Sequence, residues 1–215
     1  MRTLRSVRNF QTAEVPVELI DYVLRHATQA GSGKNRQPWR FLVIQDDRAK
    51  EQLAHWYRRG WHHHLDRLNS LESGENRIPD EERQVSAGAA LARNFDDVPV
   101  IIVACFLPAD RNPADFFGGA SIYPAVQNLL LAARSVGLGA TLTTLQAFDV
   151  PNGQTRAHTS LTLYEELKDI LGIPGDVVPS ALIPLGWPAE PFGFVRRRPV
   201  SEVTYRERWG QRWLV

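Results

Sequence analysis

The chain has 215 residues, of which 25 are Lys or Arg and 24 are Asp or Glu, so its formal net charge is +1. A charge so close to zero gives no support to binding of nucleic acid or of a membrane surface. The length suits one domain, with two small domains as the alternative, and the single cysteine, Cys105, excludes an intrachain disulfide and a zinc-thiolate cluster.

Neither a membrane helix nor a secretion signal is expected. The longest apolar stretch, residues 98–109, is shorter than the roughly 20 residues that a membrane helix needs, and it contains two prolines. The first eleven residues hold no apolar stretch. We therefore expect a soluble, cytoplasmic protein, and one cysteine agrees with a reducing compartment.

The N-terminal part predicts an irregular basic arm, a helix and a strand. Pro16 suits the first turn of a helix, and apolar residues recur at helical spacing between residues 19 and 27. The run Phe41–Ile44 then predicts a short strand, and the acidic pair that follows predicts the start of a second helix.

Residues 55–86 show no clean period and predict a cover or a partner-contact element. They contain Trp56, Tyr57 and Trp61, then a polar run over residues 69–80. Flat aromatic faces can stack on an aromatic substrate, so Trp61 is a candidate substrate contact. The alternative is that these aromatics pack a dimer interface.

The C-terminal part alternates buried strands with helices, which predicts an α+β fold with a mixed sheet flanked by helices. The run 98–106 is continuously apolar, as in a strand buried on both faces. The other expected elements are a helix over 121–136 ended by Gly137, a strand over 138–145, a helix over 161–171 ended by Gly172, a strand over 178–187 and a basic arm over about 188–215.

Several familiar motifs fail on inspection. The glycine-rich segment 31–35 lacks the first glycine and the hydroxyl residue of a phosphate loop, and Gly137 with Gly139 lacks the third glycine of a dinucleotide fingerprint. The adjacent histidines 62–64 have no complementary ligand spacing, so a solvated cluster is expected and no metal site. No nucleophile elbow is present.

Three segments carry residues suited to an anionic, heterocyclic ligand. Arg2, Arg5 and Arg8 recur around Ser6, and guanidinium groups suit phosphate. The amide-rich segment 35–40 offers paired donors and acceptors for a ring edge. The third segment is the arginine run 196–198. Each segment also has an interpretation without a ligand. The N-terminal arginines can form a solvated arm, the amide-rich segment a turn with a packed tryptophan, and the arginine run a charged tail.

Together and in this order, these segments resemble the FMN-dependent nitroreductase family. Residues 4–10, Leu-Arg-Ser-Val-Arg-Asn-Phe, are similar to its N-terminal signature, and residues 32–41 to its Ser-x-x-Asn-x-Gln-Pro-Trp-x-Phe signature. The resemblance continues through residues 119–139, 171–174, 185–188 and 196–199. It implies one nitroreductase-like domain over residues 1–215, with a variable insert at about 55–86 and an arm at about 188–215, in an intertwined homodimer.

The resemblance also implies an activity. An NAD(P)H-dependent oxidoreductase of this kind passes hydride from NADH or NADPH through FMN to nitroaromatic or quinone acceptors by ping-pong kinetics, and the cofactor rather than a side chain carries the chemistry. Other reactions on the same scaffold, flavin fragmentation or reductive dehalogenation, and a non-catalytic flavin-storage role are the alternatives.

The matching positions are the expected flavin contacts. They fall into four groups: the N-terminal arm, the amide-rich turn, the threonine-rich strand end and the tail. In an extended tail alternate residues share a face, which favours the pair 196 and 198 over 197 without excluding the other phase. The expected set is Arg5, Ser6, Arg8, Ser32, Asn35, Gln37, Leu142, Thr143, Thr144, Arg196 and Arg198.

The sequence departs from the family pattern at three places. Leu4 stands where many members have a further arginine, and Gly31 replaces the usual proline before Ser32, which loosens that turn. The stretch 146–160 is longer than in the simplest members. These departures put the substrate in doubt more than the cofactor.

Overall fold

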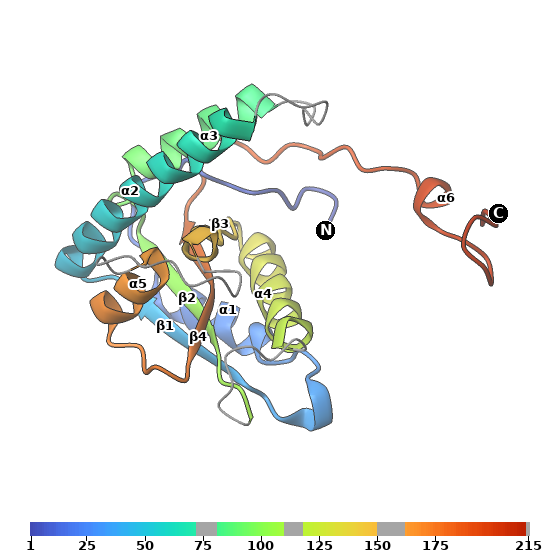
Figure 1. Cartoon of the computed structure of the whole chain (residues 1–215), viewed down its shortest axis with the longest axis horizontal. Helices are drawn as coiled ribbons and strands as arrows, with labels where there is room; N and C mark the ends of the chain where they lie inside the picture. The colour runs from blue at the N-terminus through green and yellow to red at the C-terminus, as the bar shows by residue number, and fades with distance from the viewer. Residues whose placement is uncertain (72–80, 110–117, 150–161, 214–215) are drawn as a thin grey trace.

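Four strands form the central sheet in the order β1–β2–β4–β3, and all neighbouring strands are antiparallel (Figure 1). The structure is a computed structural model that describes residues 1–71, 81–109, 118–149 and 162–213. The strands are β1 (Trp39–Ile44), β2 (Val100–Phe106), β3 (Gly139–Ala140) and β4 (Val178–Gly186). The expected α+β class is confirmed.

Strand β2 is buried on both faces, as its continuous apolar sequence predicts. Successive side chains point to opposite faces, so its even-numbered residues join one core cluster and its odd-numbered residues the other. The first cluster packs the sheet against helices α1 (Val17–Ala27) and α4 (Gly118–Ser135). The second packs it against α2 (Asp47–Leu71), α3 (Glu81–Arg93) and α5 (Leu163–Leu171).

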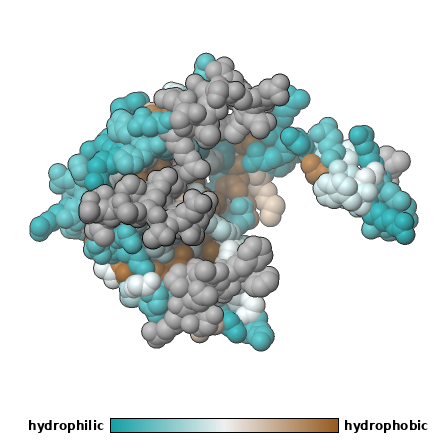
Figure 2. All heavy atoms as spheres, viewed as in Figure 1, coloured by the Kyte–Doolittle hydropathy of each residue, from teal (hydrophilic) through white to brown (hydrophobic). Residues whose placement is uncertain are grey.

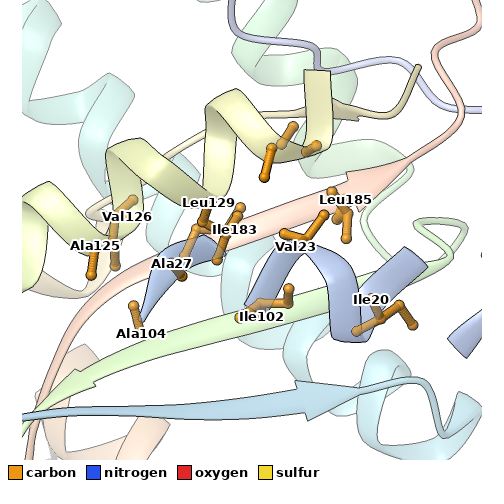
Figure 3. Packing of buried hydrophobic residues seen from close by; sticks show 14 of the residues in the cluster. Ile20, Val23, Ala27, Ile102, Ala104, Ala125, Val126, Leu129, Ile183 and Leu185 are labelled. Carbon is orange, nitrogen blue, oxygen red and sulfur yellow. The ribbon is translucent and has the colours of Figure 1, made fainter. Parts of the chain in front are cut away.

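The first cluster shows how two helices share one face of the sheet. In Figure 3, Val23 and Ala27 of α1 and Leu129 of α4 converge on the side chains of β2 and β4. Buried Ile102 and Ile183, from the two central strands, meet them there. The amphipathic pattern of α1 was therefore a reliable guide to its buried face.

The insert expected at about residues 55–86 is helical where the structure describes it, although its sequence shows no clean period. Its role as a cover or a partner-contact element stays a prediction. Residues 55–71 continue helix α2, and residues 81–86 begin α3. The buried positions 53, 56, 57 and 60 follow helical spacing, and the histidine run after them masks that period in the sequence. Residues 72–80, which hold most of the polar run, lie outside the described residues.

The strand expected over residues 138–145 is shorter than predicted. Only Gly139 and Ala140 form β3; Thr143 makes an isolated bridge to Leu182, and a 3-10 turn, η2 (Leu145–Asp149), follows. A Cβ atom on Gly139 would lie 2.9 Å from the Cβ of Val7. This glycine therefore lets the N-terminal arm lie directly against β3.

Helix α5 begins two residues later than predicted, at a capping box. Thr162 accepts a hydrogen bond from the backbone N–H of Glu165, whose carboxylate accepts one from the backbone N–H of Thr162. The carboxylate of Glu165 accepts bonds from the backbone N–H and the hydroxyl of Thr162, and these two bonds lower the pKa of Glu165 below its usual value. The helix ends at Gly172, which has φ 63° as the sequence predicts.

The C-terminal arm leaves the body of the molecule after Trp187 and ends in a projection that carries a short helix, α6 (Val200–Val203) (Figure 1). Large apolar side chains on it are open to solvent: Phe194 is 82% and Trp209 88% exposed. Figure 2 shows brown and white residues among the polar ones on this projection. The described part of the chain therefore leaves these two side chains largely uncovered.

Candidate functional site

The two ends of the chain lie side by side. The backbone N–H of Gln11 donates to the carbonyl of Trp187 at 2.8 Å, and the N–H of Ala189 donates to the carbonyl of Asn9 at 3.1 Å. Phe10 and Pro188 form an antiparallel bridge between these bonds. Segments almost 180 residues apart in sequence are thus held together by backbone hydrogen bonds, and they bring their basic residues to one place.

A cavity of about 760 Å³ opens where these segments meet helix α3. We call it the arm cavity. Its lining combines three guanidinium groups and one carboxylate with hydroxyl and amide groups, so its charge is positive. The polar and charged lining residues that matter here are Arg5, Ser6, Arg8, Asn94, Glu190 and Arg197.

The tail contributes Arg197 to the arm cavity. All three tail arginines are exposed, and Arg196 and Arg198 are not among the residues that line the cavity. The cavity therefore favours the phase that the sequence left as the alternative, and the expected contact of Arg196 and Arg198 with the flavin phosphate stays a prediction. Arg197 also donates from Nη1 to the carbonyl of Arg196 at 3.5 Å.

Arg134, in the last turn of α4, fixes both arms and was not singled out in the sequence. Its Nε donates to Thr3 Oγ1 at 3.0 Å, and its guanidinium carbon lies 3.7 Å from the ring centroid of Phe192. One side chain thus contacts the N-terminal arm and the C-terminal arm together. The only signal for Arg134 in the sequence was its position as a basic residue near a helix C-terminus. That pattern is common, so it does not single out a residue with this role.

Behind the arm cavity, a buried tyrosine connects the arm to the threonine-rich segment. The hydroxyl of Tyr57 lies 3.2 Å from Thr143 Oγ1, and its ring stacks on Phe95 with centroids 4.1 Å apart. Burial raises the pKa of the Tyr57 phenol, while the bond to Thr143 and the positive charge of Arg8 lower it in part. The phenol therefore stays protonated at neutral pH and can hydrogen-bond to Thr143.

None of the three expected flavin contacts in the threonine-rich segment, Leu142, Thr143 and Thr144, is among the residues that line the arm cavity in one chain. Leu142 is half-buried and packs against the first core cluster, and Thr144 is half-buried at the start of η2. Thr143 is held to Leu182 by backbone bonds of 2.9 Å in both directions. Their expected contacts with a flavin stay a prediction.

The amide-rich turn has a strained backbone. Lys34, Asn35 and Gln37 have φ angles of 54°, 53° and 51°, in the left-handed region that is rare for residues other than glycine. The hydroxyl of Ser32 accepts the backbone N–H of Gln37 at 2.9 Å, and Asn35 Oδ1 accepts Gln37 Nε2 at 3.2 Å. The signature residues thus hold one another in place around η1 (Gly33–Asn35).

This turn and the arm cavity lie at opposite ends of the sheet. Trp39, just after the turn, pairs with Phe106 at the end of β2, whereas the arm reaches the sheet beside Ala140, at the end marked by Val100. Seven residues of β2 separate the two ends, which corresponds to roughly 20 Å. Within one chain, the two groups of expected flavin contacts are therefore not brought together.

The aromatic residues of α2 are packed into the fold. Trp56 is fully buried and donates from Nε1 to the carbonyl of Leu163 at 2.8 Å, so it offers no face to a substrate. Trp61 is half-buried: its ring lies against Gly88 of α3 and beside His64, at 5.3 Å between centroids. A substrate contact by Trp61 stays a prediction. Neighbouring His62 and His63 are exposed.

Comparison with known proteins identifies the family to which this chain belongs. The sequence model of the nitroreductase family matches residues 1–187, and the chain belongs to that family. A protein from Methanothermobacter thermautotrophicus, with the provisional name NADH dehydrogenase/NAD(P)H nitroreductase, is 32% identical over 191 residues, covering 88% of this chain and 76% of the relative. Iodotyrosine deiodinase from Thermotoga neapolitana is 24% identical over 87% of this chain and 86% of its own length.

Solved structures share the fold at lower identity. Oxidised iodotyrosine deiodinase bound to FMN and 3-iodo-L-tyrosine superposes with a TM-score of 0.68 at 22% identity, covering 96% of this chain and 95% of the other. An FMN-dependent nitroreductase from Clostridium difficile gives 0.60 at 19% identity, over 91% of both chains. Within the described ranges, no helix of this chain combines the length and apolarity needed to cross a membrane.

Proposed function

We propose that this protein is an FMN-dependent oxidoreductase that accepts hydride from NADH or NADPH and passes electrons to nitroaromatic or quinone acceptors. The observation that carries the proposal is the arm cavity. It gathers Arg5, Arg8 and Arg197 from the two ends of the chain. Family membership and the names of the relatives support the same activity.

The donor set of the arm cavity suits the phosphate of FMN. A guanidinium presents its N–H groups in a planar fork that matches phosphate oxygens, and three such groups come together with the hydroxyl of Ser6. The volume, about 760 Å³, lies within the usual range for cofactor sites. Arg134 contacts both arms and would keep these arginines in fixed positions relative to one another.

The position of the amide-rich turn supports a site shared between two chains. Ser32, Asn35 and Gln37 match flavin contacts in the family signature, yet they lie at the far end of the sheet from the arm cavity. A second copy can supply the missing half of each site. The exposed apolar residues of the C-terminal arm, Phe194 and Trp209 among them, support such a homodimer, because large apolar groups gain by burial in an interface.

In this assignment the cofactor, when bound, supplies hydride and electron transfer, and the chain supplies binding and electrostatics. The arginines of the arm cavity hold the phosphate. The turn at residues 32–37 presents amide donors and acceptors to the ring and sugar chain of the neighbouring copy. The hydrogen bonds among Ser32, Asn35 and Gln37 keep these amides oriented before the cofactor arrives.

The test uses the purified full-length chain. We expect it to retain a yellow, FMN-containing chromophore and to oxidise NADPH or NADH when menadione or a nitroaromatic is supplied. Double-reciprocal plots at several acceptor concentrations should be parallel, as in a ping-pong mechanism. A protein that is colourless and does not take up added FMN would refute the proposal, and one that binds FMN without turnover would favour a storage role.

Reductive dehalogenation is the second candidate, because one relative and one superposing structure are iodotyrosine deiodinases. Iodide release from 3-iodo-L-tyrosine under reducing conditions decides between the two. Turnover of that substrate with little activity toward menadione would assign the chain to dehalogenation.

A further inference from the structure

A second cavity, of about 560 Å³, lies at the end of the sheet that carries the amide-rich turn. We call it the turn cavity. It is bounded by the turn, by the start of β1, by the end of β2 and by Ser121 of α4. The residues used below are Lys34, Arg36, Gln37, Arg40, Phe106 and Leu107.

Part of the lining of this cavity is cationic. Lys34, Arg36 and Arg40 contribute three positive charges, and no Asp or Glu is among the described residues that line it. The side chains of Lys34 and Arg36 have no hydrogen bond or ion pair to another residue of the described ranges. Arg40 uses only Nη1, which donates to the carbonyls of Trp39 at 2.7 Å and Gln37 at 3.4 Å. Its other N–H groups stay available, since a guanidinium has five donors.

Another part of the lining is apolar. Phe106 and Leu107, where β2 ends, form an apolar wall together with Pro38 and Pro108. The backbone N–H of Leu107 donates to the carbonyl of Pro38 at 2.8 Å, which fixes the two segments relative to each other. A fixed apolar wall and a group of cations in one cavity suit a ligand that has a flat apolar body and an anionic group.

The turn cavity borders the candidate flavin site. Gln37 lines the cavity and is also one of the expected flavin contacts, and its side chain donates to Asn35. Lys34, between two of those contacts, has φ 54°, a strained conformation that sets its direction relative to the turn. A reactant held in the turn cavity would thus lie next to the flavin of the shared site.

We propose that the turn cavity binds the anionic part of a reactant of the flavin, and that this part is the phosphate groups of NAD(P)H, with the adenine against the apolar wall. This inference rests on the proposed function. An acceptor that carries a carboxylate or phosphate presents the same chemistry, so the experiment must separate a charged donor from a charged acceptor.

The test compares wild type with the double variant Lys34→Gln/Arg36→Gln and with Arg48→Gln as a matched control. Arg48 is an exposed arginine in the first turn of α2, away from the turn cavity. Two donors are used: NADPH, and 1-benzyl-1,4-dihydronicotinamide, which has the same reactive ring without phosphates. The acceptors are menadione, which is neutral, and 4-nitrobenzoate, which is anionic.

We expect the double variant to lose about tenfold or more in kcat/KM for NADPH, because charge-assisted contacts to phosphate are lost, and to change less than twofold with the benzyl donor. The control should match wild type with both donors. Equal kcat/KM for NADPH in variant and wild type would overturn the inference. A loss confined to 4-nitrobenzoate would also overturn it and assign the cavity to the acceptor.

A binding measurement keeps this test separate from the proposed function. Equilibrium dialysis of ADP against the full-length protein should show affinity that weakens about tenfold in the double variant and falls with added salt. If neither donor reduces the protein, the proposed function fails, and the dialysis still decides whether the cavity binds an adenine nucleotide. Equal ADP binding by variant and wild type would refute the cavity assignment.

Discussion

Replacing Arg134 with alanine should loosen both arms of the chain at once and weaken FMN binding. The side chain makes two contacts: the 3.0 Å hydrogen bond from Nε to Thr3 and the stack on Phe192 at 3.7 Å. A hydrogen bond from a charged group contributes about 1.5 kcal/mol or more, and a partly exposed cation–π contact about 0.5–1 kcal/mol. Together they amount to about 2 kcal/mol of arm docking.

This free energy of arm docking sets the upper limit of the effect that Arg134→Ala can have on FMN binding. If FMN binds only when the arms are docked, a loss of about 2 kcal/mol raises its dissociation constant by up to about 30-fold. Arg134→Lys keeps the charge but loses the planar stack, so it should fall between wild type and alanine. The melting temperature should change little, because Thr3 and Phe192, which Arg134 contacts, lie outside both core clusters.

Two measurements check this reasoning. Equilibrium dialysis of FMN gives the dissociation constant, and amide hydrogen exchange at Ala189, whose N–H donates to Asn9, reports arm docking without cofactor. Arg25→Ala is the control, since Arg25 only pairs with Asp21 on the exposed surface of α1. Unchanged exchange and unchanged FMN affinity in Arg134→Ala would show that the backbone bonds alone hold the arms.

Three further outcomes are expected. Arg5→Ala or Arg8→Ala should raise the FMN dissociation constant about tenfold or more by dialysis, and an unchanged constant for both would mean that the arm is only solvated. Deletion of residues 206–215 should give monomers or aggregates by size-exclusion chromatography with light scattering; a well-behaved dimer would contradict the assigned role of the arm. Burial raises the pKa of the Cys105 thiol from its ordinary value of 9.0 to about 12, so the unfolded chain releases this proton first as the pH rises above 9.0. Stability should then fall by about 1.4 kcal/mol by pH 10, and urea unfolding of Cys105→Ala should lack this loss relative to its own value at pH 8.

The sequence alone predicted the helices and strands whose buried residues follow a local hydrophobic pattern. The continuous apolar run of β2 predicted a strand covered on both faces, and the spacing in α1 predicted its buried side. Gly172, at φ 63°, ended α5 where a left-handed residue was expected. The resemblance to the family could also be found from the sequence alone, because it depends on short motifs and their order and not on contacts between distant residues. In α2 the helical period was present too, at positions 53, 56, 57 and 60, but the histidines after it obscured the pattern.

Only the tertiary structure decided how the candidate site is assembled. That Arg197, and not Arg196 or Arg198, lines the arm cavity depends on how the tail is turned after its backbone bonds to the N-terminal arm. The alternation of side chains along an extended chain says that neighbours point to opposite sides, but it does not say which of them faces the cavity. The roles of Arg134 and of Gly139 beside Val7 arise from contacts between segments far apart in sequence. The separation of the turn from the arm cavity likewise follows from strand order and register, which no local pattern encodes.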